Sequence, residues 1–589
     1  MPNEPRNGND GGGRILRFDR EPSFYAKRGD AKRAKNDPIS AVSMYYEALE
    51  RDPMDLDTRL AAAEVLTDMS RFNDSDRLVI PYMHEDAEFM KEAYCIVGFN
   101  LLGMGETEGA RGCFNRFFEL TDEVSARTDA ILDALDYIDS LDPEETLLSD
   151  ASAAEYEAKL MAAHKAFDSG NFQTASDLFK SLHEKHPDDA HILYELSLSF
   201  LCDLKAEEGG KYADLLLEKQ PKSWGGMALK LMSARALGNE IDMKRTAKLL
   251  EKCDSDNPDE LFRVNGALLE ADFAEQAMPT AKKLVKLLPF DQLANHRLAV
   301  CFMRTGQYKK AAELYDKLLR IDRNDSVAKF YRAGCVEADR DPNCAFARSR
   351  LMNQYQLPLD SILEGVKTLL GNKDLGPDEL RGRWESDPDF RATVRWSFTL
   401  REFNITYAML AVLRVIGDDK AERLLREVLA DIDVSGAVMN EALGVLKSMG
   451  AKEPFFAMAD GRLLEGRVNI VDFSDIRIPT AYSEIFPRMR SLAEGLYSSE
   501  VISIAAGIVE RLFVGCAGNF PKISKEQSVA MSAAVEFLAC ERCGVLVRDD
   551  LFSRYGITER RLENAIDRII QIIMSVGGSA PIDGNGDGE

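Results

Sequence analysis

No stretch of this sequence approaches the ~20 consecutive apolar residues that a membrane-spanning helix needs. The amino-terminal segment MPNEPRNGNDGGGR lacks the apolar centre of a secretion signal. Ten cysteines in 589 residues are too few for a disulfide framework and fit a reducing compartment. We therefore expect a cytoplasmic protein that has no contact with a membrane.

Basic residues are in deficit, because 74 Lys and Arg face 99 Asp and Glu and give a net charge of −25. An acidic excess of this size repels phosphate at long range, which argues against a general binder of nucleic acid or of anionic membranes. Apolar residues nevertheless make up 45% of the chain, a share that is typical of a folded protein and too high for wholesale disorder.

The motifs of common catalytic sites are missing as well. The sequence has neither the phosphate-binding pattern GxxxxGK[ST] nor the nucleophile pattern GxSxG. Cys540 and Cys543 form the only close cysteine pair, and without a second pair they favour an incidental role over a zinc site or a redox site. His183 and His186 at a helix end lack the further ligands of a metalloprotease motif. We expect no enzyme activity, no metal and no cofactor, and rank an enzyme with an unrecognised site third.

What the sequence does have is a period of 34 residues. Segments 167–187 (FDSGNFQTASDLFKSLHEKHP) and 302–322 (FMRTGQYKKAAELYDKLLRID) align as a helix end, a glycine turn and an amphipathic second helix. The second helix carries a small residue, Ala175 or Ala311, followed four positions later by Phe179 or Tyr315. Units of this kind start near residues 156, 190, 224, 258, 292 and 326, and an earlier set starts near 22, 56 and 91.

The small residue lets two helices approach closely, the aromatic ring fills the space above it, and each pair has an apolar stripe that only a neighbouring pair can bury. On this pattern, residues 22–358 resemble a tetratricopeptide repeat (TPR) protein, although the first-helix Trp of that family is absent. The resemblance implies a mainly α fold, an α-solenoid that winds as a superhelix, with a HEAT-type solenoid as the alternative. It also implies a non-catalytic scaffold for protein partners, and a homodimer is an alternative assembly because such superhelices also self-associate.

In the TPR family, positions 2, 5, 9 and 12 of each first helix line the concave face. Carried over to this sequence, they give an apolar and aromatic lining, whose members are Phe99, Leu160, Tyr194, Leu198, Phe262, His296, Met303 and Phe330. The Lys and Asn residues with which some family members clamp a terminal carboxylate are absent. We therefore expect the groove to hold an apolar peptide or helix of a protein partner. The alternative is that these residues only pack inside a tight superhelix.

The period ends after residue 358. We expect helices over 420–432 and 437–449, and a short β-hairpin over 455–471 that turns at Asp460 and Gly461. Residues 549–570 resemble a helix-turn-helix, and together with a helix over 528–540 they resemble the end of a cyclin-box domain.

A helix-turn-helix would expose four side chains suited to DNA, namely Arg560, Arg561, Asn564 and Arg568. Glu559, Glu563 and Asp567 share that helix and would repel phosphate. A packed hairpin or a protein-docking module is therefore favoured for this segment. A regulator whose repeats bind protein while this segment contacts DNA or transcription machinery is the alternative to a scaffold.

The predicted organisation follows from these patterns. Its parts are a disordered tail (1–20), a first TPR-like array (21–123), a spacer helix (124–155), a second array (156–358), a linker (359–390), helical hairpins with the β-hairpin (391–487), a C-terminal helical module (488–574) and a disordered acidic tail (575–589).

Overall fold

The computed structural model describes residues 20–121, 126–141, 151–349, 351–371, 375–468, 478–493, 495–516, 520–543, 545, 547–548 and 550–577. The predicted tail over 1–20 lies outside these ranges except for Arg20, and so does 578–589 of the predicted acidic tail. Over the described residues the protein is mainly α-helical with one two-stranded antiparallel sheet, which confirms the predicted fold class.

Three helix pairs form the amino-terminal array. They are α1 (Pro22–Arg33) with α2 (Pro38–Leu49), α3 (Leu56–Asp68) with α4 (Phe72–Val79) and the short η1 (Ile80–Tyr82), and α5 (Ala87–Met104) with α6 (Thr107–Leu120). The helix expected after them is α7 (Ala126–Leu141), which packs on α6.

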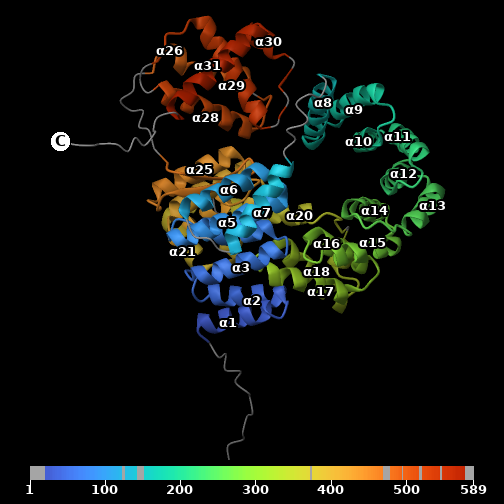
Figure 1. Ribbon diagram of the computed structural model, residues 1–589. Coiled ribbons are helices and arrows are strands. Elements are labelled where there is room, and N and C mark those ends of the chain that lie inside the picture. The colour runs from blue at the N-terminus through green and yellow to red at the C-terminus, as the bar shows by residue number, and fades with distance from the viewer. Residues whose placement is uncertain are drawn as a thin grey trace, which may run out of the picture.

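The second array continues with pairs that pack in sequence order. They are α8 (Ala151–Asp168) with α9 (Phe172–Lys185), α10 (Ala190–Cys202) with α11 (Ala206–Lys219), α12 (Trp224–Ala236) with α13 (Glu240–Leu250), α14 (Pro258–Glu270) with α15 (Ala274–Leu287), α16 (Gln292–Arg304) with α17 (Tyr308–Ile321), and α18 (Ser326–Arg340) with α19 (Ala345–Arg348). Figure 1 shows these helices as an arch with α8, α10, α12, α14, α16 and α18 on its inner side. The expectation of a full second helix in the last unit is wrong, because α19 has only four residues.

The period is visible in the backbone as a left-handed residue at each turn between paired helices. Gly170, Leu204, Gly238, Asp272 and Gly306 all have positive φ and lie 34 residues apart. A side chain in this conformation crowds the following carbonyl, which glycine avoids. Leu204, with φ of 60° and 91% of its surface exposed, therefore occupies a strained position without compensating burial.

The small-and-aromatic pairing predicted for each unit is confirmed. Ala175 and Phe179 are fully buried, and so are Ala311 and Tyr315. In the first array the same contact is tighter, since a Cβ added to Gly98 would lie 2.4 Å from the Phe114 ring. Helix approach in each pair is thus set by the residue opposite the ring.

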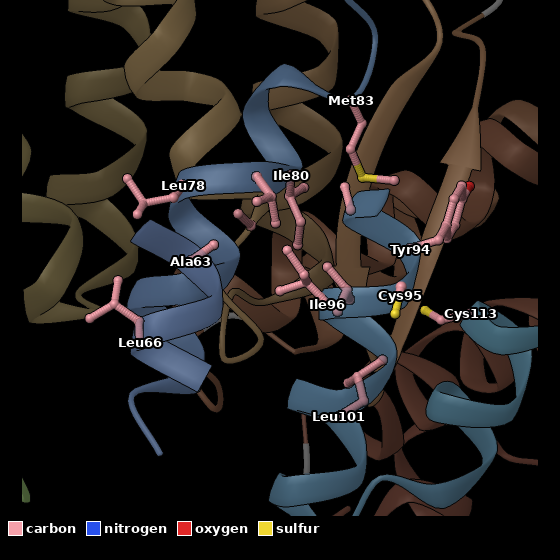
Figure 2. Packing of buried hydrophobic residues seen from close by; sticks show 14 of the residues in the cluster. Ala63, Leu66, Leu78, Ile80, Met83, Tyr94, Cys95, Ile96, Leu101 and Cys113 are labelled. Carbon is pink, nitrogen blue, oxygen red and sulfur yellow. The ribbon is translucent and has the colours of Figure 1, made fainter. Parts of the chain in front are cut away.

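The core of the first array extends beyond its own helices. Figure 2 shows Ala63 and Leu66 of α3, Leu78 of α4, and Ile96 and Leu101 of α5 packed together. The same cluster contains Ile321, Ala430, Phe456 and Met458, which come from distant parts of the chain. Later segments therefore complete the core of the first array.

Those later segments are more helical than expected. The predicted linker over 359–390 holds α20 (Leu359–Leu370), α21 (Pro377–Ser386) and the start of α22 (Pro388–Ser397), which η2 (Phe398–Leu400) follows. The two expected helices are α24 (Asp419–Leu429) and α25 (Gly436–Ser448), preceded by α23 (Phe403–Ile416). The predicted β-hairpin is confirmed as β1 (Phe455–Ala459) paired with β2 (Arg462–Gly466), and Asp460 and Gly461 at its turn both have positive φ.

The last segment forms its own apolar cluster. Its helices are α26 (Thr480–Ser483), α27 (Ile485–Leu492), α28 (Ser499–Cys516), α29 (Lys525–Arg542), α30 (Leu551–Tyr555) and α31 (Glu559–Gly577). The fully buried carboxylate of Glu536 accepts hydrogen bonds from Arg554 (2.6 Å), Tyr555 (2.7 Å) and Tyr497 (2.9 Å). This network fixes α30 against α29, because a buried charge must be fully hydrogen-bonded.

A second buried carboxylate lies in the first array. Asp76 Oδ1 accepts a 2.7 Å hydrogen bond from Asn100, while Asp76 Oδ2 is buried without a partner. Burial raises the pKa of Asp76 to about 7, although the Asn100 hydrogen bond acts in the opposite direction. The folded protein therefore holds a proton on Asp76 at mildly acidic pH that the unfolded chain releases.

The turn at Leu204 offers a direct test of the strain described above. We expect Leu204→Gly to raise the stability of the second array by about 1 kcal/mol, because it removes left-handed strain and loses no packing. Gly238→Ala is the matched reverse change, since an added Cβ meets nothing within 4 Å and the cost of about 1 kcal/mol comes from the backbone alone. Urea unfolding followed by circular dichroism measures both, and a loss of stability in Leu204→Gly would contradict this account.

Asp76→Asn tests the buried carboxylate. A raised native pKa gives stability that is present below the unfolded pKa of about 4 and is lost as the pH rises to about 7. We expect Asp76→Asn to gain roughly 2 kcal/mol over the wild type at pH 8, and this difference to vanish near pH 4. The exposed Asp136→Asn should show a difference that does not change with pH, and equal curves for Asp76→Asn would refute the assignment.

Candidate protein-binding surface

The inner face of the second array is built from the first helix of each pair (Figure 1). On this face the Tyr194 ring of α10 contacts residues of the next two first helices. A Cβ on Gly225 of α12 would lie 3.0 Å from the Tyr194 ring, and the guanidinium of Arg263 on α14 stacks 4.3 Å from the ring centroid. The absence of a side chain at Gly225 therefore lets three helices converge on one aromatic ring.

The residues predicted for the groove divide into two environments. Leu160, Tyr194, Leu198 and Phe262 are half-buried and lie on α8, α10 and α14, so part of each side chain reaches solvent. Phe99 is also half-buried, but it belongs to the first array and packs edge-on against Phe114 at 5.1 Å. The four residues of the second array form the part of the predicted lining that a ligand can reach, which we call the open groove.

The other predicted residues lie at the far end of the arch and are covered by the chain itself. His296 is fully buried and Met303 is 2% exposed, while Phe330 packs on Phe346 with 6.0 Å between ring centroids. Residues 351–356, which we call the strap, lie over this end and hydrogen-bond to His296. The alternative that predicted groove residues only pack inside the fold therefore holds for His296 and Met303.

Two arginines of the inner face were not among the predicted residues. Arg263 and Arg297 lie 34 residues apart, at the position after the predicted aromatic site in their repeats. Arg297 is 6% exposed, stacks 5.3 Å from the Phe262 ring centroid and donates to the Phe262 carbonyl at 2.5 Å. Burial lowers the pKa of Arg297 to about 10. Their common spacing was a signal in the sequence, but the family positions carried over did not include it.

The arch closes on the first array through polar contacts. Arg71 donates to the Phe290 carbonyl at 3.3 Å and to Asp74 at 2.6 Å. Arg323 bonds Glu47 at 2.8 Å and the Ser43 carbonyl at 3.2 Å. Because these contacts join residues more than 200 positions apart, they fix the far end of the arch to α2 and α4.

A cavity of about 1320 Å³ lies at this junction and is lined by α2–α4, by the end of the arch and by residues 395–438. Acidic side chains outnumber arginines on its wall, and the arginines are engaged, as in the Arg77–Asp431 pair at 3.5 Å. Burial, together with the charges of Asp74 and Asp325, raises the pKa of Asp322. The wall therefore offers no positive field for a phosphate ligand.

The C-terminal candidates for DNA contact lie on α31. Arg560, Arg561 and Asn564 are exposed, whereas Arg568 is half-buried and its guanidinium reaches the Lys522 carbonyl at 3.5 Å. Arg561 pairs with Glu526 at 3.0 Å. Phe552, which departs from the helix-turn-helix pattern, is 40% exposed and so does not obstruct the turn.

The weaker chemical candidates bring no site together. Cys540 is fully buried, and burial raises the pKa of its thiol to about 11, which disfavours the thiolate that redox chemistry requires. Within the described ranges, no group of three or more His, Cys, Asp or Glu side chains is placed to hold a metal. The helices that the structure describes are each too short or too polar to cross a bilayer.

Comparison with known proteins identifies one repeat directly. Residues 292–325 match the family model of a tetratricopeptide repeat, and this stretch begins at a predicted unit start and covers α16 and α17. Repeats of this family generally act as non-catalytic modules for protein interaction. No curated protein matches the sequence.

Several solved structures of tetratricopeptide repeats resemble the chain. One, from Thermus thermophilus, shares 16% identity over 31% of this chain and 99% of its own, with a TM-score of 0.27. A protein from Parabacteroides merdae shares 12% identity over 54% and 98%, with a TM-score of 0.24. The TPR2AB domain of yeast Sti1, solved as a complex with pHSP90, shares 12% identity over 45% and 98%, with a TM-score of 0.20.

The closure of the arch can be tested at Arg71. Its side chain is 9% exposed and its partner Asp74 is 11% exposed, so Arg71→Ala leaves a carboxylate with reduced compensation. We expect a loss of roughly 3 kcal/mol in urea unfolding and faster amide exchange in α17. Arg323→Ala removes a more exposed contact and should cost less than about 1 kcal/mol. Equal effects of the two changes would contradict this ranking.

Proposed function

We propose that this tetratricopeptide-repeat chain is a non-catalytic scaffold whose open groove binds an apolar segment of a protein partner. The observation that carries the proposal is the contrast between the two ends of the inner face. Tyr194 and Leu198 keep exposed surface, whereas His296 and Met303 lie beneath the chain's own strap. Only the first part of the array therefore has its apolar inner residues accessible to another molecule.

The chemistry of the open groove supports an apolar or aromatic ligand. Leu160, Leu198 and Phe262 present aliphatic and aromatic surface, and Trp224 and Met227 of α12 are half-buried between them in sequence. Aromatic residues in such a setting act as anchors worth ~2 kcal/mol or more each, because they exclude water over a large area at little entropic cost. Arg263 above Tyr194 adds a donor at the rim that orients a ligand without requiring a terminal carboxylate.

The rigidity of the groove also favours binding. The Tyr194 ring is held between Gly225 and Arg263, so it does not have to be immobilised when a ligand arrives. A preformed surface loses less conformational entropy on association than a flexible one. An amphipathic helix or an extended apolar segment that lies along α8, α10 and α12 fits such a surface.

The test uses a double variant of the open groove. We expect Tyr194→Ala with Leu198→Ala to reduce capture of the native partner more than tenfold, while the melting temperature falls by only a few degrees. Crosslinking mass spectrometry on the full chain, with a photoreactive residue at Leu198, identifies the segment that is bound.

Ile241→Ala is the matched control, because Ile241 is 81% exposed on α13, the second helix of its pair. Capture by this variant should equal that of the wild type. Equal losses in both variants would show that the partner does not use the inner face, and a collapsed melt of the double variant would show that its residues belong to the core.

A further inference from the structure

The strap (351–356) lies on the inner face of α14, α16 and α18 as a bound peptide would. Its residues are bent rather than helical, and its partners belong to helices that precede it by 25 to 83 positions. Leu351 and Tyr355 pack on the apolar cluster of the array, and Asn353 is 7% exposed. The structure thus shows a short segment of known sequence seated in the array.

The array recognises two main-chain carbonyls of the strap. His296 Nε2 donates to the Met352 carbonyl at 3.0 Å, and the Tyr331 hydroxyl donates to the Gln356 carbonyl at 3.3 Å. Since a carbonyl only accepts, Nε2 carries the proton, and Nδ1 accepts from the Tyr315 hydroxyl at 2.8 Å. Burial lowers the pKa of His296 to about 4, which keeps this neutral tautomer at physiological pH.

A side-chain amide of the strap is bound through both of its polar atoms. Arg304 donates to Asn353 Oδ1 at 2.8 Å, and Asn353 Nδ2 donates to Glu270 at 2.7 Å. A carboxylate at this position would face Glu270, and an ammonium group would face Arg304. The Arg304 and Glu270 pair therefore selects an amide over either charged side chain.

An aromatic position follows two residues later. The Tyr355 hydroxyl donates to Asp325 Oδ2, which also accepts from Gln292 at 3.0 Å. The Tyr355 ring packs edge-on against His296 with 5.4 Å between ring centroids. Phenylalanine would keep the ring contact and lose the bond to Asp325, so the hydroxyl adds a further element of recognition.

We infer that the inner face of α14, α16 and α18 is a peptide-binding site which the strap occupies in cis, and that it fits a partner segment carrying an amide residue and, two positions later, a tyrosine. The inference concerns a different part of the inner face from the open groove and does not depend on the proposed function. A tethered segment acts at an effective concentration in the millimolar range, so a separate peptide enters only when the strap is weakened.

The experiment measures fluorescence anisotropy of a labelled peptide with the sequence LMNQYQLP (residues 351–358) added to the full chain. We expect little binding to the wild type and a dissociation constant at least tenfold lower for a variant with Asn353→Ala and Tyr355→Ala. Adding Arg304→Ala and Glu270→Ala to that variant should abolish the gain. A peptide with Asp in place of Asn353 and Phe in place of Tyr355 should bind at least tenfold more weakly.

Gln354→Ala is the matched control, because Gln354 lies in the strap but its side chain is exposed. This variant should bind the peptide no better than the wild type. If the double variant does not fold, Tyr355→Phe decides, since it removes one hydrogen bond and should give a smaller gain of about threefold or more. A folded strap variant that binds no better than the wild type, or that binds both peptides equally, overturns the inference.

Discussion

Every helix pair in this protein has an apolar stripe that it cannot bury alone, and the rest of the structure follows from how each stripe is covered. Within the arrays the neighbouring pair covers it, with contacts such as Phe114 over Gly98 setting the distance between helices. The first array has a further surface, which is covered by Ile321 of α17 and by Phe456 and Met458 of β1. The two arrays and the β-hairpin are thus parts of one packing problem.

The same constraint explains why the two ends of the arch differ. At the far end α19 has only four residues, too few to cover α18 as a full second helix would. The strap follows it and supplies the missing surface, together with hydrogen bonds to His296 and Tyr331. At the near end, the inner residues of α8 and α10 keep exposed surface, which is where a partner can bind.

Charge plays a secondary but specific role at the junction. Arg71 and Arg323 reach carbonyls and carboxylates of segments far away in the sequence, so they fix the geometry of closure more than they add net attraction. In a chain with a net charge of −25, engaging these arginines leaves the cavity wall acidic, which agrees with a role in holding protein segments together.

The sequence by itself determined the repeating unit. A small residue with an aromatic four positions later, repeated every 34 residues, has one packing solution, so the helix pairs, their order and the β-turn at Asp460 and Gly461 could be predicted. The inner-face positions of Tyr194 and Leu198 followed from the same register. Only the tertiary structure decided which of these positions stay accessible, because the strap has no periodicity and its partners, such as Glu270 and Asp325, are distant in sequence. Contacts of that kind depend on the curvature of the whole array, which no local pattern specifies.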